Sequence, residues 1–126
     1  MKDPIWITVD VIYAVHEKLL DRFGGLAGVR DEGLLHSALG RPQHSFAYES
    51  PIVCEMAAEY TLGIVKNHPF LDGNKRTGFM AAYIFLGTNG IDFNAPEEEV
   101  VINTLALAAG EIDRNQYAEW LEASCE

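Results

Sequence analysis

Nine consecutive residues, HPFLDGNKR at positions 68–76, combine side chains that could bind phosphate and activate a hydroxyl group. Pro69 disfavours helical geometry at His68, and Gly73 allows the backbone to come close to a ligand. Asn74 is expected to begin a helix, whose first amides have no intrahelical acceptor and lie at the positive pole of the helix dipole. Such a helix start favours an anion, and phosphate is the usual one.

Four charged or titratable side chains of this segment indicate the chemistry. Lys75 and Arg76 add two positive charges at the helix start. Asp72 would be repelled by phosphate unless a cation lay between them, and Mg²⁺ commonly binds one or two carboxylates together with phosphate oxygens. His68 could act as a general base near neutral pH. Together they predict phosphoryl or nucleotidyl transfer from a nucleoside triphosphate, although the spacing does not say which group is transferred. Each residue alone also has an ordinary structural explanation.

Helical periodicity runs through nearly the whole chain and predicts six helices with no convincing strand. The two helices that flank the segment are expected at Ile52–Asn67 and Asn74–Thr88. The other boundaries come from capping residues and helix breakers: Thr8 and Gly24 for the first helix, Asp31 for a short second helix Glu32–Leu39 ended by Gly40 and Pro42, Pro96 for the fifth helix and Asp113 for the last.

Two segments are expected to lie outside regular helices. Arg41–Pro51 is predicted to be irregular, and the glycine-rich stretch Phe23–Arg30 could form a small hairpin or flap. The sequence therefore predicts an all-α fold, a compact six-helix bundle that forms a single domain over residues 1–126.

Composition argues against two classes of partner. The 126 residues carry a formal net charge of −10 and a pI of about 4.7, which disfavours direct binding to nucleic acid. The longest strongly apolar window, Gly78–Gly87, is about half the length of a membrane span. Only two cysteines, Cys54 and Cys125, are present, which is too few for a disulfide framework and favours a reducing compartment. The first residues, MKDPIW, do not resemble a signal peptide. We therefore expect a cytoplasmic protein that binds neither nucleic acid nor membrane.

The segment His68–Arg76 resembles the signature HPFx(D/E)GN(G/K)R of the Fic superfamily. Within that superfamily the chain is similar to the death-on-curing (Doc) branch, the toxins of toxin–antitoxin pairs. Lys75 stands where AMP-transferring Fic enzymes carry Gly, and Phe79 stands where those enzymes usually have a second Arg. The stretch FGGLAGVRDEGLLHSALGRPQ at positions 23–43 is also similar to Doc-type toxins. The resemblance covers essentially the whole chain and implies a compact helical Fic/Doc fold.

This resemblance implies the toxin of a type II toxin–antitoxin system. Its activity would be that of a Doc-type protein kinase, which transfers the γ-phosphate of ATP, with Mg²⁺, to a hydroxyl of a translation factor, elongation factor Tu, and blocks translation. It implies a cognate antitoxin whose disordered segment folds into a helix on binding. The site residues implied by position are His68 as the base, Asp72 as the Mg²⁺ ligand, Gly73, Asn74, Lys75 and Arg76 as phosphate-binding residues, and Phe70 as a buried anchor of the loop.

Two alternatives stay open. The first is a Fic-type AMP or other nucleotidyl transferase acting on a protein hydroxyl, against which Lys75 and Phe79 count. The second is a non-catalytic binding module of the same fold, against which the intact His68 and Asp72 count. The target hydroxyl, the antitoxin and the oligomeric state do not follow from the sequence.

Overall fold

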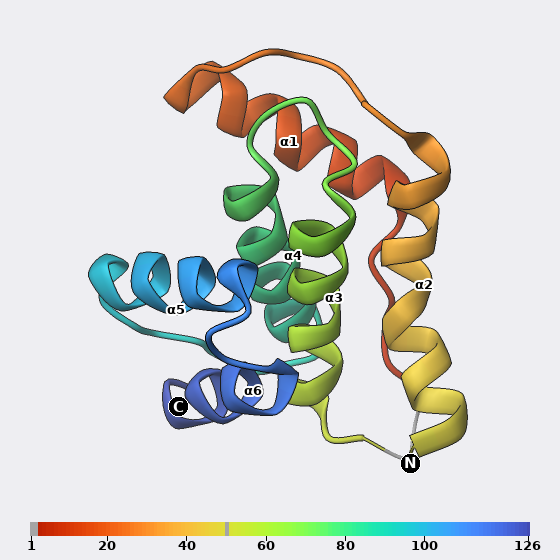
Figure 1. Ribbon diagram of the computed structural model, residues 1–126. Helices are drawn as coiled ribbons and strands as arrows, with labels where there is room; N and C mark the ends of the chain where they lie inside the picture. The colour runs from red at the N-terminus through yellow and green to blue at the C-terminus, as the bar shows by residue number, and fades with distance from the viewer. Residues whose placement is uncertain (1–2, 50) are drawn as a thin grey trace.

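The computed structural model describes residues 3–49 and 51–126, and these residues form six helices (Figure 1). In chain order they are α1 (Val9–Phe23), α2 (Glu32–Glu49), α3 (Val53–Asn67), α4 (Asn74–Thr88), α5 (Glu97–Ala109) and α6 (Arg114–Ala123). No strand is assigned within this part of the chain, so the predicted all-α class and the six-helix count are confirmed. None of the described helices is both long enough and apolar enough to cross a membrane.

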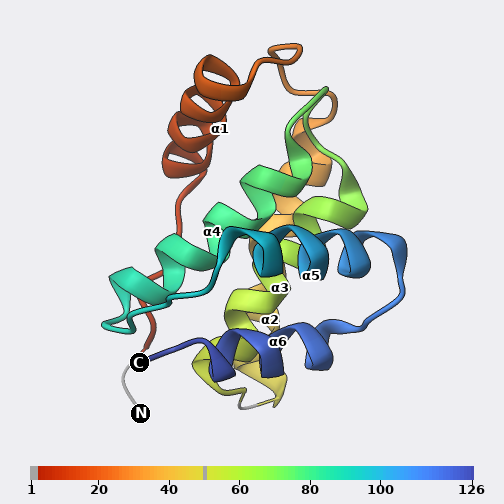
Figure 2. The same ribbon diagram turned by 90° about the vertical axis from the view of Figure 1, so that its left-hand side faces the viewer.

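Helix α3 is the central element of the bundle. It packs against α2 on one side and against α4, α5 and α6 on the others, while α1 crosses one end of the α3–α4 pair (Figures 1 and 2). Its side chains are buried around most of its circumference, as expected for a helix surrounded by others. The largest fully buried side chains of the core are Tyr60, Tyr117, Phe70 and Phe85. Because α3 is enclosed in this way, its C-terminal end is held firmly beside α4.

The helix starts expected from capping residues are present. Thr8 accepts a hydrogen bond from the amide of Val11, and Asp31 accepts one from the amide of Leu34 at 2.9 Å. Asp113 begins α6 with a capping box. These contacts are local, which is why the sequence pattern located them.

Helix α2 corrects two predictions. It does not stop at Leu39 but continues to Glu49, so the irregular stretch expected from Arg41 onward is helical as far as the structure describes it; Ser50 lies outside the described residues. Pro42 is buried inside the helix, although proline removes one backbone hydrogen bond and costs about 3 kcal/mol there. Its place in the buried stripe that begins at Leu35 explains the continuation, because burial against α3 offsets that penalty.

The segment between α1 and α2 does not form a hairpin with itself. Val29 instead makes an isolated antiparallel bridge with Phe70 of the α3–α4 junction. The amide of Arg30 donates to the carbonyl of Pro69, and the amide of Leu71 donates to the carbonyl of Gly28 at 3.1 Å. The predicted flap is therefore a loop that uses its backbone to hold the junction carrying the HPFLDGNKR segment.

Candidate active site

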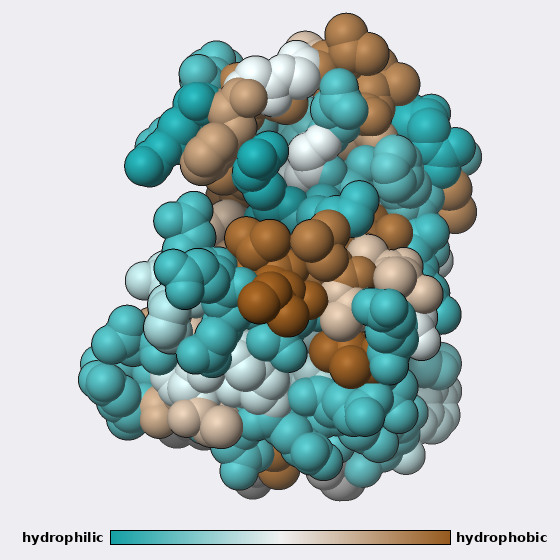
Figure 3. Space-filling model, turned by 60° about the vertical axis from the view of Figure 1, so that its left-hand side comes forward, coloured by the Kyte–Doolittle hydropathy of each residue, from teal (hydrophilic) through white to brown (hydrophobic). Residues whose placement is uncertain are grey.

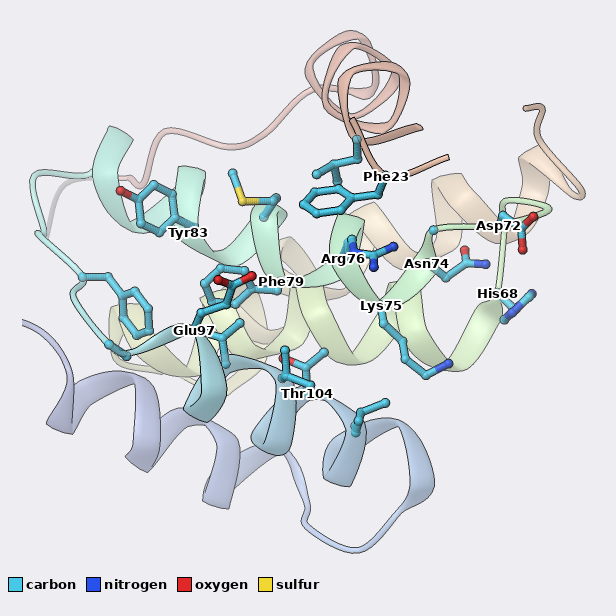
Figure 4. Close-up of a pocket in the computed structure, with 18 of the residues that line it drawn as sticks. Phe23, His68, Asp72, Asn74, Lys75, Arg76, Phe79, Tyr83, Glu97 and Thr104 are labelled. Atoms are coloured by element: carbon cyan, nitrogen blue, oxygen red, sulfur yellow. The ribbon is translucent and has the colours of Figure 1, made fainter. Parts of the chain in front are cut away.

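All six predicted site residues line one cleft of about 700 Å³ (Figure 4). They are His68, Asp72, Gly73, Asn74, Lys75 and Arg76. The cleft runs from the α3–α4 junction along α4 to α5, with the end of α1 above it. The structure thus brings the predicted residues together, while the role of each stays a prediction.

His68 ends α3 in a left-handed backbone conformation, with φ 51° and ψ 53°. It is the only residue other than glycine with positive φ among the described residues, and the proline that follows it disfavours a right-handed helical conformation at this position. Arg30 fixes this turn, since its Nε donates to the carbonyl of His68 at 2.7 Å and its Nη2 donates to the carbonyl of Asn67 at 2.9 Å. The backbone is held while the imidazole stays exposed, which suits a proton acceptor for a substrate hydroxyl.

Gly73 begins α4 in a left-handed conformation, with φ 79°. The first amide to donate back into the helix is that of Thr77, which bonds the carbonyl of Gly73 at 3.0 Å. The amides before it belong to the helix start that favours an anion. Lys75 and Arg76 are exposed in the same first turn (Figure 4), so positive charge and free amides lie on the same stretch of the cleft.

The side chain of Asn74 has a different partner from the one expected. It is buried, with 4% of its surface exposed. Its Oδ1 accepts from the amide of Phe70 at 3.0 Å, and its Nδ2 donates to the carbonyl of Phe70 at 2.9 Å. The side-chain amide is committed to closing the loop, so a phosphate contact from Asn74 would come from its main-chain amide. Phe70 is fully buried, which confirms the expected anchor.

Asp72 is half-buried at the loop, and its Oδ2 accepts a hydrogen bond from the amide of Leu26 at 2.7 Å. No group of three or more His, Cys, Asp or Glu side chains that could hold a metal occurs within residues 3–49 and 51–126. A lone carboxylate beside an anion site matches Mg²⁺ that binds together with phosphate oxygens and water, rather than in an all-protein cage. The donor set therefore fits the predicted cofactor when nucleotide is present.

The far end of the cleft is apolar, and sequence reasoning missed it. Its lining side chains come from α4, α5 and the segment between them: Phe79, Met80, Tyr83, Phe93, Val100, Val101 and Leu105. Figure 3 shows apolar side chains gathered beside a hollow on this face of the molecule. The exposed apolar residues Val101, Ile102 and Leu105, spaced one, three and four apart on α5, were the available indication in the sequence.

Phe23, the last residue of α1, also lines the cleft. The guanidinium carbon of Arg76 lies 4.3 Å from the centre of its ring, a cation–π contact between α1 and the start of α4. Phe23 is itself 47% exposed. Figure 4 shows Phe23 above Arg76.

His16 is a second residue at the site that sequence reasoning missed. Its ring stacks on Phe70, and its Nε2 lies 2.8 Å from the main-chain oxygen of Asp72. Its position four residues after the buried Ile12, on the inward stripe of α1, was the only indication in the sequence. Because α1 lies far from the junction in sequence, that spacing could not name its partner.

Comparison with known proteins places the chain among relatives. Residues 6–86 match the model of the Fic/DOC family. The chain is 35% identical over 117 residues to the protein kinase doc of Escherichia phage P1, covering 91% of each chain. It is also 38% identical over 99 residues to the toxin Doc of Mycolicibacterium smegmatis, covering 72% of this chain and 75% of that one. With this similarity and the helical fold around the HPFLDGNKR segment, the chain belongs to the Fic/DOC family.

Proposed function

We propose that this protein is a Mg²⁺-dependent protein kinase of the Doc type, which acts in the cytoplasm as the toxin of a type II toxin–antitoxin system. It would transfer the γ-phosphate of ATP to a hydroxyl of elongation factor Tu and so block translation. One observation carries the proposal: His68, Asp72 and the cationic start of α4 line one cleft, in a chain whose relative from phage P1 is named a protein kinase.

The chemistry assigned to the cleft is a direct transfer. His68 takes the proton of the acceptor hydroxyl as its oxygen attacks the γ-phosphorus, and the bond from the γ-phosphorus to the β–γ bridging oxygen breaks. The products are a phosphorylated protein, ADP and a proton. Lys75, Arg76 and the first amides of α4 counter the charge of the triphosphate. Asp72 would hold Mg²⁺, which when bound supplies further charge neutralisation of the phosphate oxygens.

Labelled ATP tests this function directly. Purified protein is mixed with elongation factor Tu and ATP labelled at either the γ- or the α-phosphate. We expect label on the factor from γ-labelled ATP alone, and none with the His68→Ala variant. The His44→Ala variant is the matched control, because His44 is an exposed histidine that does not line the cleft. Label from α-labelled ATP would replace the kinase with a nucleotidyl transferase. If neither label is transferred, mass spectrometry of a treated translating extract decides whether another protein is the target.

The apolar end of the cleft is proposed to receive the antitoxin. Its occupant would be an amphipathic helix that places an apolar stripe against Val101 and Leu105, which are 49% and 48% exposed. Three acidic residues, Glu97–Glu99, form the first turn of α5 beside it. This favours a helix whose flanking residues are Lys or Arg, since opposite charges would face each other.

A further inference from the structure

Of the four histidines in the sequence, all within the described residues, His16 alone is buried, with 6% of its surface exposed. It lies on the face of α1 that crosses the α3–α4 junction. Its ring stacks on that of Phe70, with centroids 3.8 Å apart and planes 12° from parallel. A polar ring buried in this way is costly unless its nitrogens have partners, so the contact of its ring nitrogen matters.

That contact is made to the residue proposed to hold the metal. Nε2 of His16 lies 2.8 Å from the main-chain oxygen of Asp72. A carbonyl oxygen only accepts hydrogen bonds, so Nε2 carries a hydrogen and donates it. The next residue is also close, since a Cβ built on Gly73 would lie 3.6 Å from Cδ2 of His16. The loop backbone at Asp72 and Gly73 therefore rests directly against this ring.

Asp72 is held from two sides as a result. His16 holds its main chain from α1, and the amide of Leu26 holds its carboxylate through Oδ2 at 2.7 Å. The first contact fixes the peptide group between Asp72 and Gly73, and the second fixes the orientation of the Asp72 side chain. A carboxylate fixed in this way loses little freedom when it binds a cation, which raises affinity.

We propose that His16 is a positioning residue, which sets the place of the Asp72 carboxylate and thereby the affinity of the cleft for metal-loaded nucleotide, without touching either ligand. The inference rests on the proposed role of Asp72 as a Mg²⁺ ligand. Groups that orient a metal ligand typically change metal affinity or activity by about 10- to 100-fold when they are replaced.

Histidine combines two contacts that other residues supply one at a time. Phenylalanine at position 16 keeps the stack on Phe70 but removes the donor to the Asp72 carbonyl. Glutamine keeps a donor but loses the aromatic stack. These two replacements separate the packing role of His16 from its hydrogen bond.

The test measures binding without catalysis, using Mn²⁺ and a non-hydrolysable ATP analogue. Electron paramagnetic resonance follows Mn²⁺, and calorimetry gives the affinity for the analogue with and without metal. For His16→Phe we expect affinity for the metal-loaded analogue to fall about tenfold or more, while affinity for the metal-free analogue changes by less than about twofold. His16→Gln should recover part of the loss. His44→Phe is the matched control, at an exposed histidine whose ring packs at a tilt against that of Tyr48, and should change neither affinity.

Two results with the folded His16→Phe variant would overturn the inference. Unchanged affinity for the metal-loaded analogue would mean that His16 does not influence metal binding. An equal loss of affinity with and without metal would mean that its role is structural only. If the variant does not fold, the wild-type protein still decides the matter through the ¹⁵N spectrum of its histidines, in which Nε2 of His16 must carry a hydrogen. A bare Nε2 rules the proposal out. Wild-type protein that binds the analogue no better with Mn²⁺ than without it would refute the proposed metal-dependent function, and this inference with it.

Discussion

At the polar end of the cleft, the loop from His68 to Gly73 is held by hydrogen bonds from α1, from the segment that follows α1 and from α4. At the apolar end, by contrast, Val101 and Leu105 of α5 stand about half exposed, and Ile102 beside them is 65% exposed. At the polar end almost every residue of the loop is held by a hydrogen bond, whereas the apolar end exposes apolar side chains to water.

This difference indicates two kinds of occupant. A group-transfer site gains when its charges and its base are positioned before the substrate arrives, because ordering them during the reaction would raise the barrier. Apolar surface left open on a small protein is instead typical of a contact with another protein. The polar end thus suits chemistry on a small charged ligand, and the apolar end suits a macromolecular partner.

The largest expected effect comes from removing the base at the polar end. His68→Ala should slow phosphate transfer by about 10²- to 10⁴-fold, since a positioned general base contributes about that much, and should abolish growth inhibition. Because the imidazole is exposed, the fold and antitoxin binding should be retained. Initial rates, circular dichroism and growth curves check these outcomes. If the variant inhibits growth as strongly as the wild type, the inhibition results from binding rather than from catalysis by His68.

The next effect belongs to the apolar end. Leu105→Glu would put a charge into the surface proposed to receive the antitoxin helix, and we expect antitoxin affinity to fall about 30-fold or more, as for a truncated interface hot spot. Ile5→Glu is the matched control, because Ile5 is 58% exposed and does not line the cleft. Calorimetry against the proposed antitoxin gives both affinities. Equal affinities for the two variants would move the antitoxin to another surface.

A third comparison concerns stability. Asn74→Ala removes both hydrogen bonds that close the loop and leaves buried backbone groups of Phe70 unpaired, so the free energy of unfolding should fall by about 2–4 kcal/mol. Val101→Ser at the apolar end should change it by less than about 0.5 kcal/mol. Urea unfolding measures both. Similar losses of unfolding free energy would mean that the two ends contribute equally to the stability of the fold.

The smallest expected effect is a loss of folding stability at high pH, which depends on Tyr117 of α6. Burial raises the pKa of Tyr117 to about 12, partly opposed by its hydrogen bond with Thr104, which lines the apolar end. Because the folded pKa lies above the usual value near 10, this group's contribution to stability is complete below pH 10 and is lost as pH rises toward 12. At pH 11 the loss is about 1 kcal/mol. Tyr117→Phe should flatten the fall in urea midpoint between pH 10 and 12, and an unchanged slope would contradict this assignment.

Local rules account for what the sequence predicted correctly. The caps at Thr8 and Asp113, the turn around His68 and the start of α4 all depend on residues within a few positions of each other. They could be read from propensity and backbone sterics. The resemblance then assigned six residues of the motif to one site, and all six line the cleft.

The errors arise where distant contacts override local rules. Pro42 ends a helix by local reasoning, yet α2 continues because its apolar stripe is buried against α3. His16 meets Asp72 across 56 positions of sequence. Such partners are set by how the helices cross, which one sequence does not specify.

The stacking of Phe23 on Arg76 has a consequence for signalling between the two occupants. A guanidinium offers its flat face to an aromatic ring and its rim of N–H groups to phosphate, so the ring and a nucleotide need not compete for Arg76. An antitoxin that pushed Phe23 aside would remove only the facial contact, worth about 0.5–1 kcal/mol at such an exposed position. Communication through this pair is therefore limited to roughly a fivefold change in nucleotide affinity, and a stronger effect of the antitoxin would need another route, of which direct occupation of the cleft is the simplest.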